Sequence, residues 1–130
     1  MTTALYASLA TFLIIWLSFN VIKLRRKHQI SIGYGGKKDL KLATTAHSNA
    51  IEYLPISLLL LFALELNQAN LILLHILGIL VFASRVLHAN SILTENLKRR
   101  VLAMQTTFVC MTVLALANLA YLPFEKLSVG

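Results

Sequence analysis

The residue types best suited to chemistry gather between Thr45 and Pro55. This stretch contains the imidazole of His47, the amide of Asn49 and the carboxylate of Glu52, within a segment that is otherwise apolar enough to span a membrane. A carboxylate near the middle of a bilayer costs a few kcal/mol unless it has a partner, so such a residue indicates a functional site. The rest of the chain must therefore place this segment in the membrane and supply partners for Glu52.

The composition is typical of an integral membrane protein. Of the 130 residues, 58% are hydrophobic and 13% are charged, whereas a soluble domain carries about 25% charged residues. The net charge is +7, and most of the basic residues lie beside apolar runs. This position indicates that the charges orient the protein in the membrane and attract anionic head groups, rather than bind nucleic acid. The single cysteine, Cys110, excludes an internal disulfide, and the sequence has no metal-ligand spacing.

Four apolar runs are long enough to cross the hydrocarbon core as helices. They predict a single all-α membrane domain over residues 1–130, a bundle of four transmembrane helices at about 4–26, 40–66, 71–92 and 100–122. A cationic cluster follows the first run, where a signal peptide would have a small-residue cleavage site. We therefore expect the first run to be a retained helix.

The basic residues predict the topology. Of the 12 Lys and Arg residues, seven lie between Lys23 and Lys41 and three lie between Lys98 and Arg100. Four spans place both cationic loops on one face of the membrane, and the positive-inside rule assigns that face to the cytoplasm. We therefore expect a multi-pass protein with loops 23–41 and 93–100 in the cytoplasm and both termini on the opposite side.

A second charge inside a span is Arg85, which shares a helix face with His88. Glu52 and Arg85 lie in the cytoplasmic halves of adjacent antiparallel helices, so we expect the carboxylate and the guanidinium to approach. One interpretation is a structural ion pair between the second and third helices. The other is a polar cleft open to the cytosol, which suits an anionic or zwitterionic ligand and whose rim carries Arg25, Arg26, Arg99 and Arg100.

These residues resemble the motifs of the MAPEG family, the membrane-associated proteins in eicosanoid and glutathione metabolism. The family's His-x-Asn-x-x-Glu pattern matches residues 47–52, and its Arg-x-x-His pattern matches residues 85–88. The basic run 23–27 and Arg100 look like the residues that close the family's first helix and open its fourth. The Asn-Ala-x-Glu-Tyr-x-Pro form of residues 49–55 is similar to that of small bacterial members. The resemblance therefore implies a bacterial inner membrane.

The resemblance also implies a homotrimer that binds glutathione, as a co-substrate, between adjacent subunits. Arg100 would be the catalytic residue, because a cation that stabilises the thiolate supplies the reactive nucleophile. The second substrate would be a hydrophobic small molecule that arrives from the lipid bilayer. The residues implied to bind glutathione are Lys23, Arg25, His47, Asn49, Glu52, Arg85 and His88.

The chain departs from the family's pattern at positions that serve thiol activation. Stronger members carry arginine, serine or tyrosine where this chain has Thr45, Ser48, Ile92, Val101 and Met104. The leading hypothesis is a glutathione transferase or peroxidase with a role in detoxification. The missing residues keep open a non-catalytic glutathione- or lipid-binding module. One membrane-embedded carboxylate keeps open a small proton-coupled exporter that uses Glu52.

Overall fold

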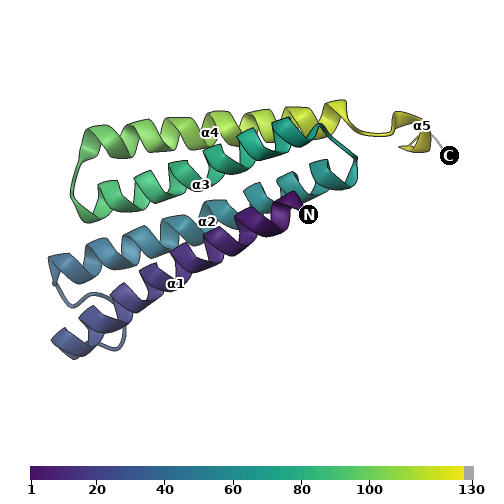
Figure 1. The fold of residues 1–130 in the computed structure, drawn as a ribbon. Helices are drawn as coiled ribbons and strands as arrows, with labels where there is room; N and C mark the ends of the chain where they lie inside the picture. The colour runs from purple at the N-terminus through teal and green to yellow at the C-terminus, as the bar shows by residue number, and fades with distance from the viewer. Residues whose placement is uncertain (128–130) are drawn as a thin grey trace.

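The structure is a computed structural model that describes residues 1–127, and it is a bundle of four long helices (Figure 1). The helices are α1 (Thr2–His28), α2 (Lys38–Leu66), α3 (Leu71–Leu93), α4 (Leu97–Ala120) and a short α5 (Phe124–Leu127). No strand occurs within the described range. The predicted all-α class is therefore confirmed.

The start of α4 differs from the expected residue 100 because of a side-chain cap. The Asn96 side chain accepts a hydrogen bond from the backbone N–H of Arg99 at 3.1 Å. An amide at this position satisfies one of the first-turn N–H groups that lack an intrahelical acceptor. The helix therefore begins at Leu97.

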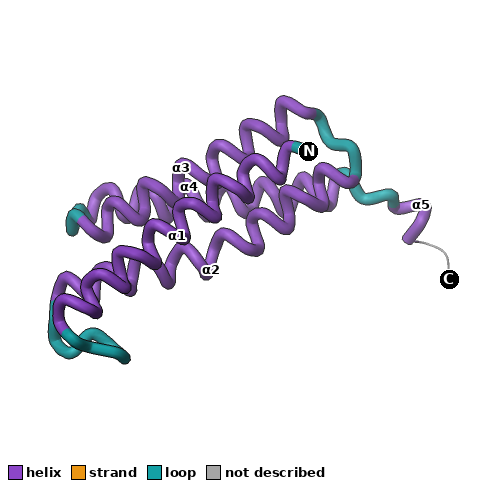
Figure 2. Tube along the Cα trace, turned by 60° about the horizontal axis from the view of Figure 1, so that its bottom comes forward, coloured by secondary structure: helices purple, strands orange, loops and turns teal. Residues whose placement is uncertain are grey.

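Helices α2 and α3 form the centre of the bundle. Each contacts the other three long helices, whereas α1 and α4 lie on opposite sides of this pair and do not contact one another (Figures 1 and 2). Buried leucines from all four helices, such as Leu17, Leu54, Leu77 and Leu114, fill the space between them. A residue on α1 is therefore separated from one on α4 by the central pair of helices.

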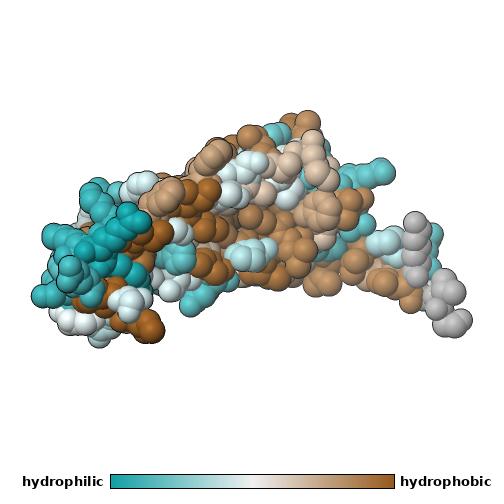
Figure 3. Space-filling model, turned by 90° about the horizontal axis from the view of Figure 1, so that it is seen from below, coloured by the Kyte–Doolittle hydropathy of each residue, from teal (hydrophilic) through white to brown (hydrophobic). Residues whose placement is uncertain are grey.

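The outer surface is suited to lipid. All four long helices are long and apolar enough to cross a membrane, and they expose large hydrophobic side chains, including Phe12, Trp16 and Val109. On the face drawn in Figure 3, apolar surface covers most of the length of the bundle, and hydrophilic surface gathers at the end that carries the α1–α2 connection. Apolar side chains that no helix covers are the expected lipid-facing surface of a membrane bundle.

The two cationic loops lie at the same end of the bundle, as the topology predicts. Lys38 Nζ, at the start of α2, lies 2.7 Å from Glu95 Oε1 in the turn between α3 and α4. The N-terminus and the α2–α3 turn lie at the opposite end (Figure 1). We refer to the end with the Lys38–Glu95 ion pair as the cationic end.

At the opposite end, a carboxylate of α2 caps α1. Glu65 accepts hydrogen bonds from the backbone N–H groups of Thr2 at 2.7 Å and Thr3 at 2.8 Å. These first-turn groups have no acceptor within their own helix, and the N-terminal end of a helix carries a partial positive charge. Glu65 therefore joins the end of α2 to the beginning of α1.

We expect Glu65→Ala to lower the free energy of unfolding by about 1–2 kcal/mol, because two first-turn N–H groups lose their acceptor. Unfolding in mixed micelles with increasing SDS, followed by the fluorescence of the single tryptophan, Trp16, measures this change. Glu65→Gln keeps one acceptor oxygen without the charge, so its free energy of unfolding should lie between those of the unmodified protein and Glu65→Ala. Equal stability of all three proteins would contradict the cap.

Candidate functional site

Arg85 lies inside the bundle where α2, α3 and α4 meet, with only 2% of the residue exposed. Its Nη2 donates a hydrogen bond to the Thr107 hydroxyl on α4 and lies 3.6 Å from Met104 Sδ. The guanidinium carbon lies 4.9 Å from the centroid of the Tyr53 ring on α2, within range of a cation–π interaction. Arg85 thus links three helices.

Some polar atoms of Arg85 and of the neighbouring His88 have no hydrogen-bond partner. Nε and Nη1 of Arg85 and Nε2 of His88 make no hydrogen bond within residues 1–127. His88 is 2% exposed and lies about one helical turn closer to the cationic end, within coulombic reach of both Arg85 and Arg100. A buried polar group without a partner costs about 1–3 kcal/mol. Three of the four buried side-chain atoms without a partner in residues 1–127 therefore belong to Arg85 and His88, on one face of α3.

Glu52 does not pair with Arg85. Its carboxylate is exposed on the outer side of α2 and forms no hydrogen bond or ion pair with any described residue. Successive residues of a helix point about 100° apart, and it is the neighbouring Tyr53 that turns toward α3 and covers the guanidinium. The predicted ion pair, and the predicted recess enclosing both charges, are therefore wrong for the single chain.

The other two motif residues of α2 have local or neighbouring partners. Asn49 Nδ2 donates a hydrogen bond to the Thr45 carbonyl at 3.0 Å, and Asn49 shares a helix face with Glu52 at a spacing of three residues. His47 Nε2 lies 3.0 Å from Ser18 Oγ on α1. His47 thus joins α2 to α1, while Asn49 and Glu52 occupy the outer face of α2.

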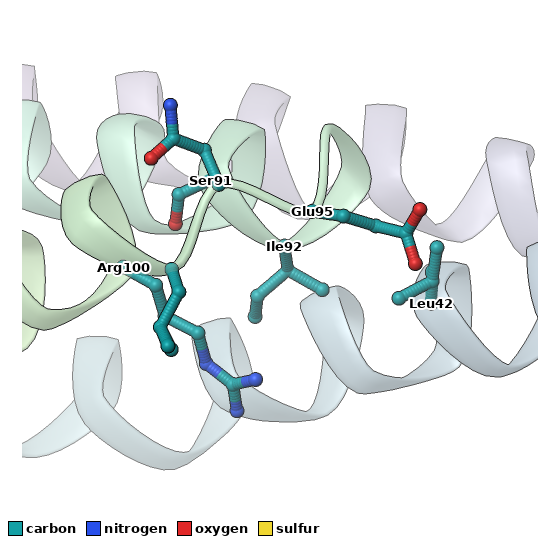
Figure 4. A pocket seen from close by; sticks show the side chains of 7 residues that line it. Leu42, Ser91, Ile92, Glu95 and Arg100 are labelled. Atoms are coloured by element: carbon teal, nitrogen blue, oxygen red, sulfur yellow. The ribbon is translucent and has the colours of Figure 1, made fainter.

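A pocket of about 210 Å³ opens at the cationic end between α2, α3 and α4 (Figure 4). Its charged groups are Arg100 and Glu95, which Figure 4 shows on different sides of Ile92. Glu95 already pairs with Lys38, whereas no described residue forms a hydrogen bond or ion pair with the Arg100 side chain. The pocket therefore offers one unpaired cation to an anionic group. Its lining consists of Leu42, Ser91, Ile92, Glu95, Asn96, Leu97 and Arg100.

The two expected site residues of α1 lie away from this pocket. Arg25 Nη1 donates hydrogen bonds to the carbonyl of Gly33 at 2.8 Å and, more weakly, to that of Ile30 at 3.4 Å. Arg25 therefore folds the α1–α2 connection back onto α1. Lys23 is exposed on the same helix. Because α1 and α4 lie on opposite sides of the central helices, one chain holds both Arg25 and Arg26 apart from Arg100. The expected rim of four arginines around one cleft is therefore not formed within the single chain, and the Arg100 pocket has no α1 residue in its lining.

The structure thus divides the expected site residues between the interior, the contact of α2 with α1, the outer face of α2 and the end of α1. Arg85 and His88 lie in the interior near the Arg100 pocket, and the other five do not join them within one chain. No three His, Cys, Asp or Glu side chains between residues 1 and 127 lie close enough together to hold a metal ion. The sequence did not indicate the contacts made by the neighbours of these groups, which are Tyr53, Met104 and Ser91. Thr107 could have been found from the sequence, because a hydroxyl in an apolar helix often forms a hydrogen bond with a neighbouring helix.

Comparison with known proteins agrees with a location in a membrane. The sequence profile of the MAPEG family matches residues 3–120. Inner membrane protein YecN of Escherichia coli strain K12 is 36% identical over 125 residues, which cover 96% of this chain and 95% of YecN. YecN of Escherichia coli O6:H1 has the same identity and coverage. With four helices able to cross a bilayer, the chain is a multi-pass membrane protein and belongs to the MAPEG family.

Proposed function

We propose that the protein is a multi-pass inner-membrane protein that binds glutathione between the subunits of a homotrimer and transfers it to a hydrophobic electrophile or uses it to reduce a lipid peroxide. Membership of the MAPEG family and the similarity to an inner membrane protein support this proposal. The observation that carries it is the group of unpaired buried polar atoms on Arg85 and His88. His88 lies one helical turn before Ser91, which lines the Arg100 pocket.

The chemistry of these atoms suits the carboxylates and carbonyl oxygens of a tripeptide. Arginine N–H groups form their strongest hydrogen bonds with carboxylates, often two at once. Arg85 has Nε and Nη1 free for such a bond, since Nη2 is occupied by Thr107. Arg100 adds a second cation at the mouth of the same region. A ligand with two carboxylates matches two separated guanidinium groups.

The outer face of α2 supports a site that two chains complete. Glu52 is exposed and unpaired in one chain, and its helix is one of the four that can cross the membrane. A carboxylate facing acyl chains is unfavourable, so it calls for a partner such as an ammonium or amide group. Lys23 is exposed on α1, on the far side of the bundle from Arg100, and in this proposal it reaches a ligand held by a neighbouring chain.

In the proposed transfer, Arg100 lowers the energy of the glutathione thiolate by its positive charge. The thiolate sulfur attacks an electrophilic carbon, the new S–C bond forms, and the leaving group departs with the electron pair of the broken bond. The turn after Arg100 contains only the apolar side chains of Val101, Leu102 and Ala103. No hydroxyl in that turn assists the cation, so thiolate stabilisation rests on Arg100.

We expect Glu52→Gln to weaken glutathione binding by about tenfold or more, because a hydrogen bond to a charged group contributes about 1.5–3 kcal/mol. Calorimetric titration of glutathione into the purified protein measures the affinity. Glu65→Gln is the matched control, since it makes the same change in the same helix at the other end of the bundle. Absence of binding, or equal binding by all three proteins, would contradict the proposal.

The apolar turn after Arg100 also favours a second candidate, a glutathione-binding module without transfer activity. The two are separated by the ultraviolet absorbance of the bound thiolate and by turnover of a reactive aryl halide. A transferase gives both signals, and Arg100→Gln removes them while much of the binding remains. Binding with neither signal in the unmodified protein would select the module.

A further inference from the structure

Helix α1 extends beyond the hydrocarbon core at the cationic end. It has 27 residues, which span about 40 Å at a rise of about 1.5 Å per residue, whereas the hydrocarbon core is about 30 Å thick. The first part of the helix is uncharged and its last turn is basic. That last turn, with Arg25, Arg26, Lys27 and His28, therefore lies at the level of the lipid head groups.

An open hollow of about 330 Å³ lies at this level, on the end of α1 and the connection that follows it. It combines two isoleucines with side chains that donate hydrogen bonds. Ile22 comes one helical turn before Arg26, so it lies on the same face and closer to the hydrocarbon core. The full lining is Ile22, Arg25, Arg26, Gln29, Ile30 and Ser31.

Only one of the two arginines in the hollow is free to bind a ligand. Arg25 is occupied by the carbonyls of Gly33 and Ile30, and the Ile30 N–H bonds to the Arg25 carbonyl at 3.1 Å. These contacts fix the wall of the hollow. Arg26 is exposed and has no hydrogen bond or ion pair with any described residue.

The charge around the hollow is almost wholly positive. Seven Lys and Arg residues lie between Lys23 and Lys41, and Asp39 is the one acidic residue of that segment. Asp39 is already bound by His28 Nε2, 3.0 Å from its Oδ1. The same connection exposes Ile32, with 88% of the residue accessible. An apolar tip beside unopposed cations is a surface suited to the interface of an anionic membrane.

We propose that this hollow binds the phosphate group of an anionic phospholipid, with an acyl chain lying along Ile22. A phosphodiester accepts hydrogen bonds and carries negative charge, and the Arg26 guanidinium, the Gln29 amide and the Ser31 hydroxyl supply donors around it. The hollow shares no residue with the Arg100 pocket of the same chain, which is lined by α2, α3, α4 and the α3–α4 turn. The lipid holds the α1–α2 connection against the membrane surface.

Native mass spectrometry of the purified protein, titrated with phosphatidylglycerol or phosphatidylcholine in detergent micelles, tests this site. We expect phosphatidylglycerol to bind at least about fivefold more tightly, and Arg26→Gln to weaken its binding about tenfold. Ser31→Ala should weaken it less, about threefold, because the hydroxyl is an uncharged donor at an exposed position. Lys98→Gln, which removes one exposed cation from the first turn of α4 at the same end, should change it less than about twofold.

Three results would overturn the proposal. Equal weakening by Arg26→Gln and Lys98→Gln would show attraction by surface charge alone. Equal binding of the two lipids would show that the negative charge is not recognised. Displacement by inorganic phosphate at the same concentration would assign the hollow to a soluble anion. Glutathione titration of Arg26→Gln separates the two proposals, since lipid binding should fall while glutathione affinity stays unchanged.

Discussion

Arg85→Met is expected to stabilise the protein measured without glutathione while weakening glutathione binding. Methionine keeps an unbranched side chain of similar length but removes two buried N–H groups that have no partner. Relief of that penalty exceeds the loss of the Thr107 and Tyr53 contacts, so the free energy of unfolding should rise by about 1–2 kcal/mol. Glutathione affinity should fall about 10- to 100-fold, because the proposed carboxylate contact is lost.

Two measurements on the same preparation check this pair of opposite effects. SDS-induced unfolding gives the stability, and calorimetry gives the affinity. Thr107→Val is the control, because it removes the hydroxyl that accepts from Arg85 Nη2 while its shape is retained. It should destabilise the protein by about 1–3 kcal/mol. A fall in stability for Arg85→Met as large as that for Thr107→Val would show that the guanidinium has its partners before glutathione binds.

Gly78→Leu is expected to separate α1 from α3. The Tyr6 ring lies directly over Gly78, and even a Cβ atom there would overlap the ring, including Cγ near its base. The ring cannot move aside easily, because the Tyr6 hydroxyl is bound to His75 Nδ1 at 2.8 Å and Tyr6 is 4% exposed. Overpacking of this kind costs about 1–3 kcal/mol, and small residues such as glycine allow neighbouring helices to pack closely.

Stability in SDS micelles and a distance between spin labels on α1 and α3 measure the effect. Ala83→Leu adds a side chain of the same type to an exposed position of the same helix, and we expect it to be neutral. Tyr6→Ala in the Gly78→Leu background should recover part of the loss by making room. If Gly78→Leu matches Ala83→Leu in both measurements, the Tyr6–Gly78 contact does not determine the packing of α1.

The depth of each polar residue was predictable, but its direction was not. The helical segments and the basic loops indicated that Glu52 and Arg85 lie at similar depths in neighbouring helices. Which side of α2 faces α3 depends on how both helices pack against α1 and α4. Tyr53 takes the inner position because its ring covers the guanidinium and contacts Phe108 on α4, with ring centroids 5.9 Å apart. Glu52, one residue earlier, is therefore left outside.

The same distinction applies to His47 and Glu65. The family pattern suggested that His47 belongs to a ligand site, yet its imidazole bonds to Ser18 in α1. Glu65 lies in a short polar segment of the sequence and gives no local sign of a partner more than sixty residues away. Its bonds to Thr2 and Thr3 arise only when α1 and α2 pack side by side. Contacts between distant segments cannot be deduced from helical periodicity alone.

The sequence by itself determined the membrane class, the four spans, the shared end of the two cationic loops and the family. Those properties follow from the transfer of apolar residues into a bilayer and from the positions of charges, which each segment expresses locally. Only the tertiary structure decided that Arg85 and His88 are buried with unpaired atoms, that Glu52 faces outward and that Arg25 closes its own loop. The reason is physical: rotation of a helix about its axis leaves its hydrophobicity unchanged, and side-chain packing against the neighbouring helices selects one rotation.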